Sequence, residues 1–265
     1  MKKLIKRVLR VFGLMFLADR IRFEWMKVKN RKVNSSFIRD YPNVLLPPDY
    51  MMYESFQLDY SRYFLNGKKT TQWLVDLVSP YSSLNQADVL DWGCGPGRLI
   101  RHLPELLKEA RSYTGTDYNS ETIQWCQNHL KGMRFTRNSL MPPLAFEEGS
   151  FDLAYGISIF THLSEAAHDA WLNELHRVLR QDGILFLTLH GEVFMDKLEK
   201  SEQELFRRNK LVVRGQVREG HRTFIAFHPP EYVKKWASDF TLLKHIPGKT
   251  ENGNPAQDVW ILRKD

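Results

Sequence analysis

The chain has 265 residues, of which 43% are hydrophobic and 26% charged, a composition that excludes a disordered chain, a collagen-like fibre and a low-complexity linker. Its length favours one catalytic-sized domain with an appendage. The longest apolar run spans the eight residues 11–18, far short of the roughly 20 that a transmembrane helix needs. Cys94 and Cys126 match neither a disulfide framework nor a metal-ligand spacing. We therefore expect a cytoplasmic protein without a metal site.

The positive charge is concentrated at the N-terminus. Residues 1–32 contain eleven Lys or Arg against Asp19 and Glu24, a local net charge of +9, whereas the remaining residues sum to −2. The main part of the chain is therefore not expected to offer a broad nucleic-acid-binding face.

The N-terminal arm, residues 1–33, is predicted to contain a basic amphipathic helix. Over residues 2–17, eight Leu, Ile, Val, Phe or Met side chains fall on one helical arc and five Lys or Arg on the opposite arc. This pattern favours contact with an anionic membrane surface; packing on the main domain or a partner chain, and RNA binding, are the alternatives. Residues 34–59, rich in Pro and Tyr, are predicted to form an irregular connector.

The main domain is predicted over residues 60–265, opening with a helix over 60–78. Beyond residue 87, short β-rich runs alternate with helical segments, which indicates a parallel sheet covered by helices on both faces. The predicted strands are 88–92, 112–117, 133–137, 151–158, 184–190, 241–246 and 258–263. The predicted helices are 98–110, 120–130, 164–180 and 230–238. We thus expect an α/β, Rossmann-like, mostly parallel seven-stranded sheet, with a charged insertion at about 192–228 and a long loop over 247–257 as walls of a pocket.

A glycine-rich segment carries the strongest chemical signal. VLDWGCGPGR, residues 89–98, places Asp91 at a strand end before Gly93, Gly95 and Gly97, which permit a sharp turn and close approach of the backbone to a ligand. TGTDYN places Asp117 at the end of the next strand, where a carboxylate can accept both hydroxyls of a ribose. The two segments together predict a site for a nucleoside-bearing cofactor.

VLDWGCGPGR resembles the glycine-rich motif of the class I S-adenosylmethionine-dependent methyltransferases. FDLAYGISIFTHLSE (151–165) and WLNELHRVLRQDGILFLTLHG (171–191) resemble their fourth strand, following helix and fifth strand. This resemblance covers residues 60–265 and implies S-adenosylmethionine as the cofactor. The residues it assigns to cofactor binding are Asp91, Gly93, Cys94, Gly95 and Gly97 at the amino-acid end, Asp117 at the ribose, Tyr118 and Asn138 at the adenine, and Ser158 at the methionine moiety. Asn138 stands where many relatives have an aspartate.

A hydroxyl acceptor of the methyl group would need a general base. His162, after the fourth strand, and His190, at the end of the fifth, are the candidates, and each has a packed, hydrogen-bonded histidine as its alternative interpretation. An unperturbed imidazole would lose this function as the pH falls through about 6 to 7. His221 and His228, in the insertion, are weaker candidates.

The acceptor is predicted from a looser similarity. The segments FHPPEYVKKW and GNPAQDVWILRK resemble stand-alone methyltransferases associated with bacterial surface-polysaccharide synthesis. We therefore expect O-methylation of a sugar or glycan intermediate, with the arm on the inner face of the membrane. A small metabolite, an RNA or a protein is the alternative acceptor, and a non-catalytic cofactor-binding scaffold is the alternative class. The sequence does not indicate the oligomeric state.

Overall fold

The structure is a computed structural model that describes residues 15–215, 219–220, 224–251 and 253–265. The chain divides into two compact units, with the boundary between Lys68 and Lys69. Among the described residues, no helix combines the length and the apolar character needed to cross a membrane.

The first unit is helical. It contains α2 (Met15–Asp40), α3 (Asp49–Phe56) and the beginning of α4 (Tyr60–Val78). Its core is the buried cluster Met26, Met52, Tyr53, Leu58 and Tyr63. The buried Asn34 side chain fixes the turn between α3 and α4, because its Nδ2 donates to the Leu58 carbonyl (3.0 Å) and its Oδ1 accepts from the Tyr60 amide (3.1 Å).

Two predictions for this unit need comment. The irregular connector predicted over 34–59 is wrong for its two ends, since α2 continues to Asp40 and α3 occupies Asp49–Phe56. Tertiary contacts from Asn34 and the tyrosines stabilise these helices. The sequence of these segments has no hydrophobic periodicity from which the helices could be predicted. Most of the amphipathic helix predicted over 2–17 lies outside the described residues, and residues 15–17 belong to α2.

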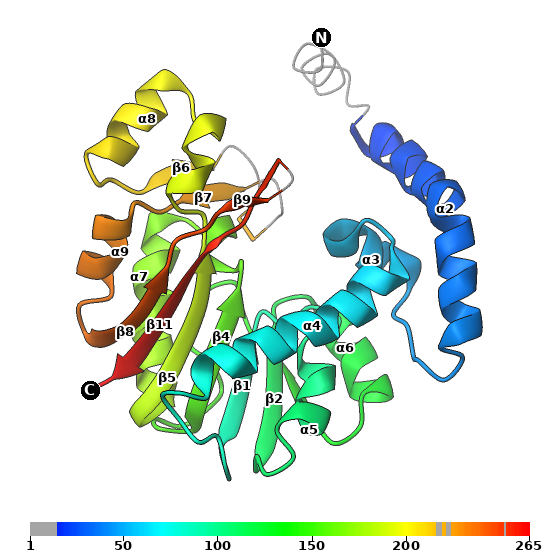
Figure 1. Cartoon of the computed structure of the whole chain (residues 1–265), viewed down its shortest axis with the longest axis horizontal. Helices are drawn as coiled ribbons and strands as arrows, with labels where there is room; N and C mark the ends of the chain where they lie inside the picture. The colour runs from blue at the N-terminus through cyan, green and yellow to red at the C-terminus, as the bar shows by residue number, and fades with distance from the viewer. Residues whose placement is uncertain (1–14, 216–218, 221–223, 252) are drawn as a thin grey trace. The chain divides into compact units, whose positions relative to one another are not determined.

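The second unit is built on the predicted seven-stranded sheet (Figure 1). The strands are β1 (Asp88–Trp92), β2 (Ser112–Asp117), β3 (Arg134–Arg137), β4 (Phe151–Ile157), β5 (Leu179–Leu189), β8 (Phe240–Ile246) and β11 (Asp258–Lys264). Their order is β3-β2-β1-β4-β5-β11-β8, and β11 alone in this sheet runs in the direction opposite to the other six strands. The order reverses direction between β1 and β4, which places a ligand crevice at the carboxyl ends of these strands.

Helices cover both faces of the sheet. They are α4, α5 (Leu103–Leu106), α6 (Ser120–His129), α7 (Glu165–Val178) and α9 (Pro230–Trp236), with short 3₁₀ turns η1 (Ile100–His102) and η2 (Phe160–His162). Trp73 of α4 meets Phe186 of β5 edge to face, with ring centroids 5.4 Å apart. The neighbouring Leu185 and Leu187 belong to the core that α7 and α9 cover. Because successive strand residues point to opposite faces, α4 and α7 lie on opposite sides of β5.

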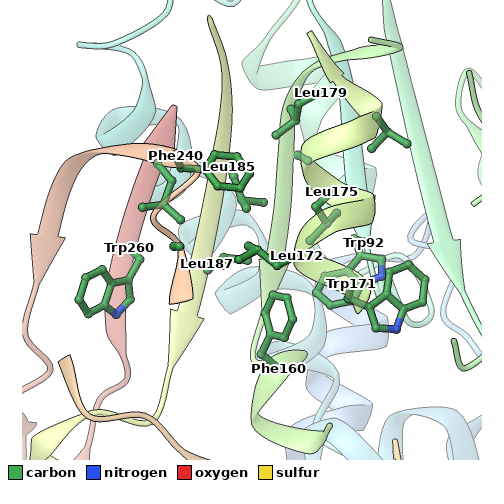
Figure 2. Packing of buried hydrophobic residues seen from close by; sticks show 14 of the residues in the cluster. Trp92, Phe160, Trp171, Leu172, Leu175, Leu179, Leu185, Leu187, Phe240 and Trp260 are labelled. Atoms are coloured by element: carbon green, nitrogen blue, oxygen red, sulfur yellow. The ribbon is translucent and has the colours of Figure 1, made fainter. Parts of the chain in front are cut away.

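The core beneath α7 explains the helical period of its sequence. Figure 2 shows Leu172, Leu175 and Trp171 of this helix directed toward the sheet, with Trp171 beside Trp92 of β1; the two indole centroids are 4.9 Å apart. Ser164 caps the N-terminus of α7, since its hydroxyl accepts from the Ala167 amide.

Three segments differ from expectation. The helix predicted over 98–110 is reduced to η1 and the four-residue α5, because Pro104 lacks the N–H that a helix interior requires. The insertion folds into η3 (Glu192–Lys197), α8 (Lys200–Arg207), β6 (Val212–Arg214) and β7 (Ile225–Phe227), around a core of its own that includes Phe194 and Phe206. The loop over 247–257 contains a short hairpin, β9 (Thr250–Glu251) and β10 (Asn254–Pro255). Figure 1 shows β6, β7 and β9 beyond the end of β5.

Candidate cofactor and acceptor site

The glycine-rich segment forms the turn that follows β1. Gly93, Gly95 and Gly97 all have positive φ, at 76°, 52° and 74°, a conformation that side chains with a Cβ rarely adopt. The amides of Gly93 and Cys94 donate to the Thr116 carbonyl of β2, at 2.8 and 2.9 Å. The turn is therefore held against the end of the neighbouring strand by backbone hydrogen bonds.

Asp117 joins this turn to the end of β2. Its Oδ2 accepts from the Gly95 amide (3.0 Å) and its Oδ1 from the Asn119 amide (2.8 Å). Burial raises the pKa of this carboxyl, while the backbone donors from Asn119, Gly95 and Tyr118 act in the opposite direction. These three donors use about three of the four lone-pair sites of the carboxylate, so it can still accept a hydrogen bond from a ribose hydroxyl.

Asp91 lies deeper, at the end of β1, and is 4% exposed. Burial raises its pKa to about 7; the Tyr155 hydroxyl, the Arg98 guanidinium and the Ile100 amide lower it, and the Asp117 charge raises it. A cationic ligand group placed near this carboxyl would favour its ionised form. The ammonium group of an amino acid is such a ligand group.

A pocket opens between the ends of β1, β2 and β4. It is lined by the predicted residues Gly93, Asp117, Tyr118, Asn138 and His162, together with Trp92, Ser139, Leu140, Ile159, Leu163, Trp171 and Gly220. Five of the added residues, from Trp92 to Trp171, are large and apolar and suit the faces of an aromatic base. The pocket thus has a polar end at the ribose position and an apolar end beyond it.

Asn138 supplies a test of whether an adenine fits this pocket. Its Nδ2 donates to the Ser139 carbonyl (2.6 Å). Its Oδ1 is buried and has no hydrogen-bond partner among the described residues. A buried acceptor without a partner costs about 1 to 3 kcal/mol. An exocyclic amino group, as adenine carries, would supply the missing donor.

Five of the nine predicted cofactor residues lie outside the lining of this pocket, namely Asp91, Cys94, Gly95, Gly97 and Ser158. The Cys94 side chain is buried, and its Sγ lies 3.0 Å from the Cβ position that Gly115 lacks. Cys94 is therefore expected to contribute its backbone alone. Ser158 comes directly after β4 with φ 65° and bonds to Gln257, a residue that the motifs do not indicate.

Both candidate bases are held by the insertion. His162 Nδ1 bonds to the Phe224 carbonyl (2.8 Å), and His190 Nδ1 bonds to the Ala226 carbonyl (3.0 Å). A carbonyl only accepts, so each Nδ1 carries the proton and each Nε2 has the lone pair that a general base uses. His162 lines the pocket and His190 does not.

The environment of His190 changes the expected pH range. Burial lowers its pKa to about 4; the Ala226 carbonyl acts against this, whereas His162 and Lys197 add to it. The imidazole range near pH 6 to 7 expected from the sequence is therefore wrong for this residue.

Gly191, the next residue, has no room for a side chain, because an added Cβ would lie 2.2 Å from the Asp258 carboxylate.

Of the two weaker candidates in the insertion, His228 and His221, the structure describes only His228. His228 is buried and its Nε2 lies 2.8 Å from His168 Nε2. Burial holds the pKa of His228 well below its usual value. This pairing favours a structural role for His228. His221 lies outside the described residues.

Comparisons with known proteins agree with this geometry. Residues 89–183 match a family model described as a methyltransferase domain. Among solved structures, an S-adenosylmethionine-dependent methyltransferase from Methanosarcina mazei is 22% identical, with a TM-score of 0.51 over 71% of this chain and 96% of its own. A putative one from Listeria monocytogenes is 13% identical, with a TM-score of 0.57 over 74% and 99%. A protein from Pyrococcus horikoshii is 17% identical, with a TM-score of 0.54 over 80% and 98%.

At these identities the solved structures establish the fold, and the family model identifies the segment from β1 to β5. That segment contains the glycine turn, Asp117, Asn138 and Ser158. The chain therefore has the fold of these methyltransferases, and residues 89–183 match the methyltransferase domain model.

Proposed function

We propose that this protein transfers a methyl group from S-adenosylmethionine to a hydroxyl group of a sugar or glycan intermediate. The observation that carries the cofactor half of the proposal is the pocket that joins Gly93, Asp117 and the partnerless Oδ1 of Asn138. When bound, the cofactor supplies an electrophilic methyl group.

The residues of the chain divide the binding among them. Asp117 accepts from a ribose hydroxyl, and Asn138 Oδ1 accepts from the adenine amino group. Asp91, with the turn of Gly93, Gly95 and Gly97, holds the amino-acid end. Holding two reactants at the correct distance and angle supplies much of the rate in a displacement of this kind.

A hydroxyl acceptor must also lose its proton. An imidazole Nε2 would take this proton as the hydroxyl oxygen replaces the sulfur of the cofactor at the methyl carbon. His190 is the proposed base, since its Nε2 has no hydrogen-bond partner among the described residues and its Nδ1 is fixed by Ala226. His162 is the second candidate, because it lines the cofactor pocket.

The sugar or glycan acceptor rests on sequence similarity and on the insertion. The insertion and the β9–β10 hairpin lie beyond the end of β5 (Figure 1), and we expect them to contact the acceptor. A small metabolite, an RNA or a protein remains the alternative acceptor, and a cofactor-binding scaffold the alternative class.

The test has two steps. Calorimetry with S-adenosylhomocysteine, the product of the cofactor, measures whether the pocket binds this nucleoside. Mass spectrometry of surface glycans from cells with and without the gene then searches for the loss of one methyl substituent. Binding without any change in glycans would direct the search to other acceptors, and binding without turnover on any acceptor class would favour the scaffold.

The proposed membrane contact is supported by an exposed apolar stripe on α2. Ile21, Trp25 and Val28 are 62%, 57% and 75% exposed and lie within about 60° of one another at 100° per residue. The buried Met26 and Phe37 lie on the opposite side of the same helix. One apolar face of α2 packs in the core of the first unit, and the second apolar face is left for contact with something outside that core.

Basic residues flank this stripe, which we call the α2 stripe (Ile21, Trp25, Val28). Arg22 and Lys29 lie on one side, Arg31 on the other, and the Lys29 ammonium is 5.0 Å from the Trp25 ring centroid. Apolar side chains bordered by cations match the interface of an anionic membrane. We propose that residues 1–32 bind the inner membrane surface, where lipid-linked glycans are assembled.

A further inference from the structure

A circuit of hydrogen bonds closes the carboxyl ends of β4 and β5. It contains the side chains of Ser158, Thr161, Thr188 and Gln257, which we call the Ser158 circuit. The Thr188 hydroxyl donates to Gln257 Oε1 (2.6 Å), and Gln257 Nε2 donates to Ser158 Oγ (2.7 Å). The Ser158 amide donates to Thr188 Oγ1 (2.9 Å). Gln257, from the segment after the β9–β10 hairpin, thereby bridges the ends of two parallel strands.

The proton positions in the circuit follow from its acceptors. The Thr161 hydroxyl donates to the Ser158 carbonyl (2.6 Å), which uses its only proton. The 2.8 Å contact between Ser158 Oγ and Thr161 Oγ1 must then be donated by Ser158. The Ser158 hydroxyl therefore donates its proton to Thr161 Oγ1 and accepts a hydrogen bond from Gln257 Nε2 with one lone pair. Its second lone pair is left for a ligand.

Ser158 lies at the partly exposed end of this circuit, together with Gln257. It is half-buried, whereas Thr161 and Thr188 are buried. Its φ of 65° is unusual for a residue with a side chain, and such conformations persist where surrounding contacts hold them. The circuit thus presents, at the end of β4, an oxygen that accepts a hydrogen bond and does not donate one.

We propose that Gln257 is a positioning residue that fixes Ser158 as an acceptor for the ammonium group at the amino-acid end of the cofactor. This inference rests on the proposed function. Of the two charged groups at that end, the ammonium donates hydrogen bonds and the carboxylate only accepts them, so the polarity of Ser158 selects the ammonium. Asp91, on the adjacent strand, supplies the opposite charge.

The test compares two nucleosides that differ at this end. S-adenosylhomocysteine carries the amino-acid group, and 5′-methylthioadenosine lacks it. Gln257→Met keeps the length of the side chain and removes both hydrogen-bonding atoms. We expect its affinity for S-adenosylhomocysteine to fall about tenfold, the scale of one hydrogen bond to a charged group, and its affinity for methylthioadenosine to stay unchanged. Gln72→Met, on the exposed side of α4, is the matched control and should change neither affinity.

A second variant protects the result against a local folding defect. Thr188→Val conserves shape and removes the donor to Gln257 Oε1, so the same selective loss is expected. Unchanged binding of both ligands by Gln257→Met, or an equal loss of both, would overturn the inference, because a merely structural role weakens the whole pocket. If the wild-type protein binds neither nucleoside, the proposed function itself fails.

Discussion

The carboxylate of Asp117 combines two functions in one side chain. It accepts the Gly95 and Asn119 amides, which holds the glycine turn against β2, and it faces the pocket at the proposed ribose position. We expect Asp117→Ala to weaken S-adenosylhomocysteine binding by roughly 1 to 3 kcal/mol, the scale of hydrogen bonds to a charged acceptor. Calorimetry measures this loss, and Asp76→Ala, an exposed aspartate on α4, is the control. Unchanged affinity in a folded Asp117→Ala protein would place the ribose elsewhere.

Asp91 makes cofactor binding depend on pH. Because burial raises its pKa to about 7, Asp91 is largely protonated below that pH and cannot pair with an ammonium. The affinity for S-adenosylhomocysteine should therefore rise as the pH increases from 5 to 7, by up to about tenfold per unit. Asp91→Asn should bind weakly and lose most of this dependence. A flat affinity for the wild-type protein across that range would contradict the assignment.

At the scale of elements, the three-residue strand β7 positions both candidate bases. Carbonyls of Phe224, just before it, and Ala226, within it, accept from His162 and His190. Alternate residues of a strand direct their carbonyls to the same edge. One short strand of the insertion therefore sets the tautomer of two imidazoles that belong to different elements.

This arrangement predicts how turnover depends on the two histidines. His190→Ala should retain S-adenosylhomocysteine binding and lower kcat by at least about 10²-fold, the usual effect of losing a general base. His162→Ala should affect stability more than rate, because it removes the bond from Nδ1 to the Phe224 carbonyl, which ties η2 to the insertion. If His162→Ala loses the activity and His190→Ala keeps it, the base is His162.

The pH profile of kcat provides an independent check. The pKa of His190 is lowered to about 4, so its Nε2 stays unprotonated as the pH falls from 7 to 5. At saturating cofactor, kcat should hold through the range of 6 to 7 in which an ordinary imidazole becomes charged. A fall with a midpoint near 6.5 would identify a base with an unperturbed pKa.

The elements that were predictable share one physical property. Strands such as β4 and β5 are buried on both faces over most of their length and contain apolar runs, and α7 repeats its core residues at helical spacing. The glycine turn and Asp117 were predictable for a related reason, since their chemistry is local in sequence. β6, β7 and the β9–β10 hairpin have two or three residues each, too few for a period to emerge. Gln257 acts on Ser158 across 99 positions, a pairing that no spacing rule reveals.

At the scale of the whole molecule, charge and chemistry lie in different parts of the sequence. Residues 1–32 hold a net charge of +9 while the rest of the chain sums to −2, and every proposed cofactor residue lies beyond Lys69. Deleting residues 1–32 would be a poor test of the membrane proposal, because it removes Met26 from the core of the first unit and Asn30 from its bonds to Gln57 and Leu58. Substitution within the α2 stripe leaves those contacts intact.

The α2 stripe therefore gives the sharper experiment. In the triple variant Ile21→Ser, Trp25→Ser, Val28→Ser, three exposed side chains lose their apolar surface while the surrounding cations remain. If each contributes about 1 kcal/mol of partial insertion, binding to phosphatidylglycerol-containing vesicles should fall about hundredfold or more, with S-adenosylhomocysteine affinity and Tm unchanged. Val33→Ser is the matched control, since Val33 is 49% exposed on the same helix and lies away from the stripe. Vesicle binding that survives the triple variant and disappears in high salt would assign the contact to charge alone, and a wild-type chain that ignores anionic vesicles at low salt would leave the stripe to a protein partner.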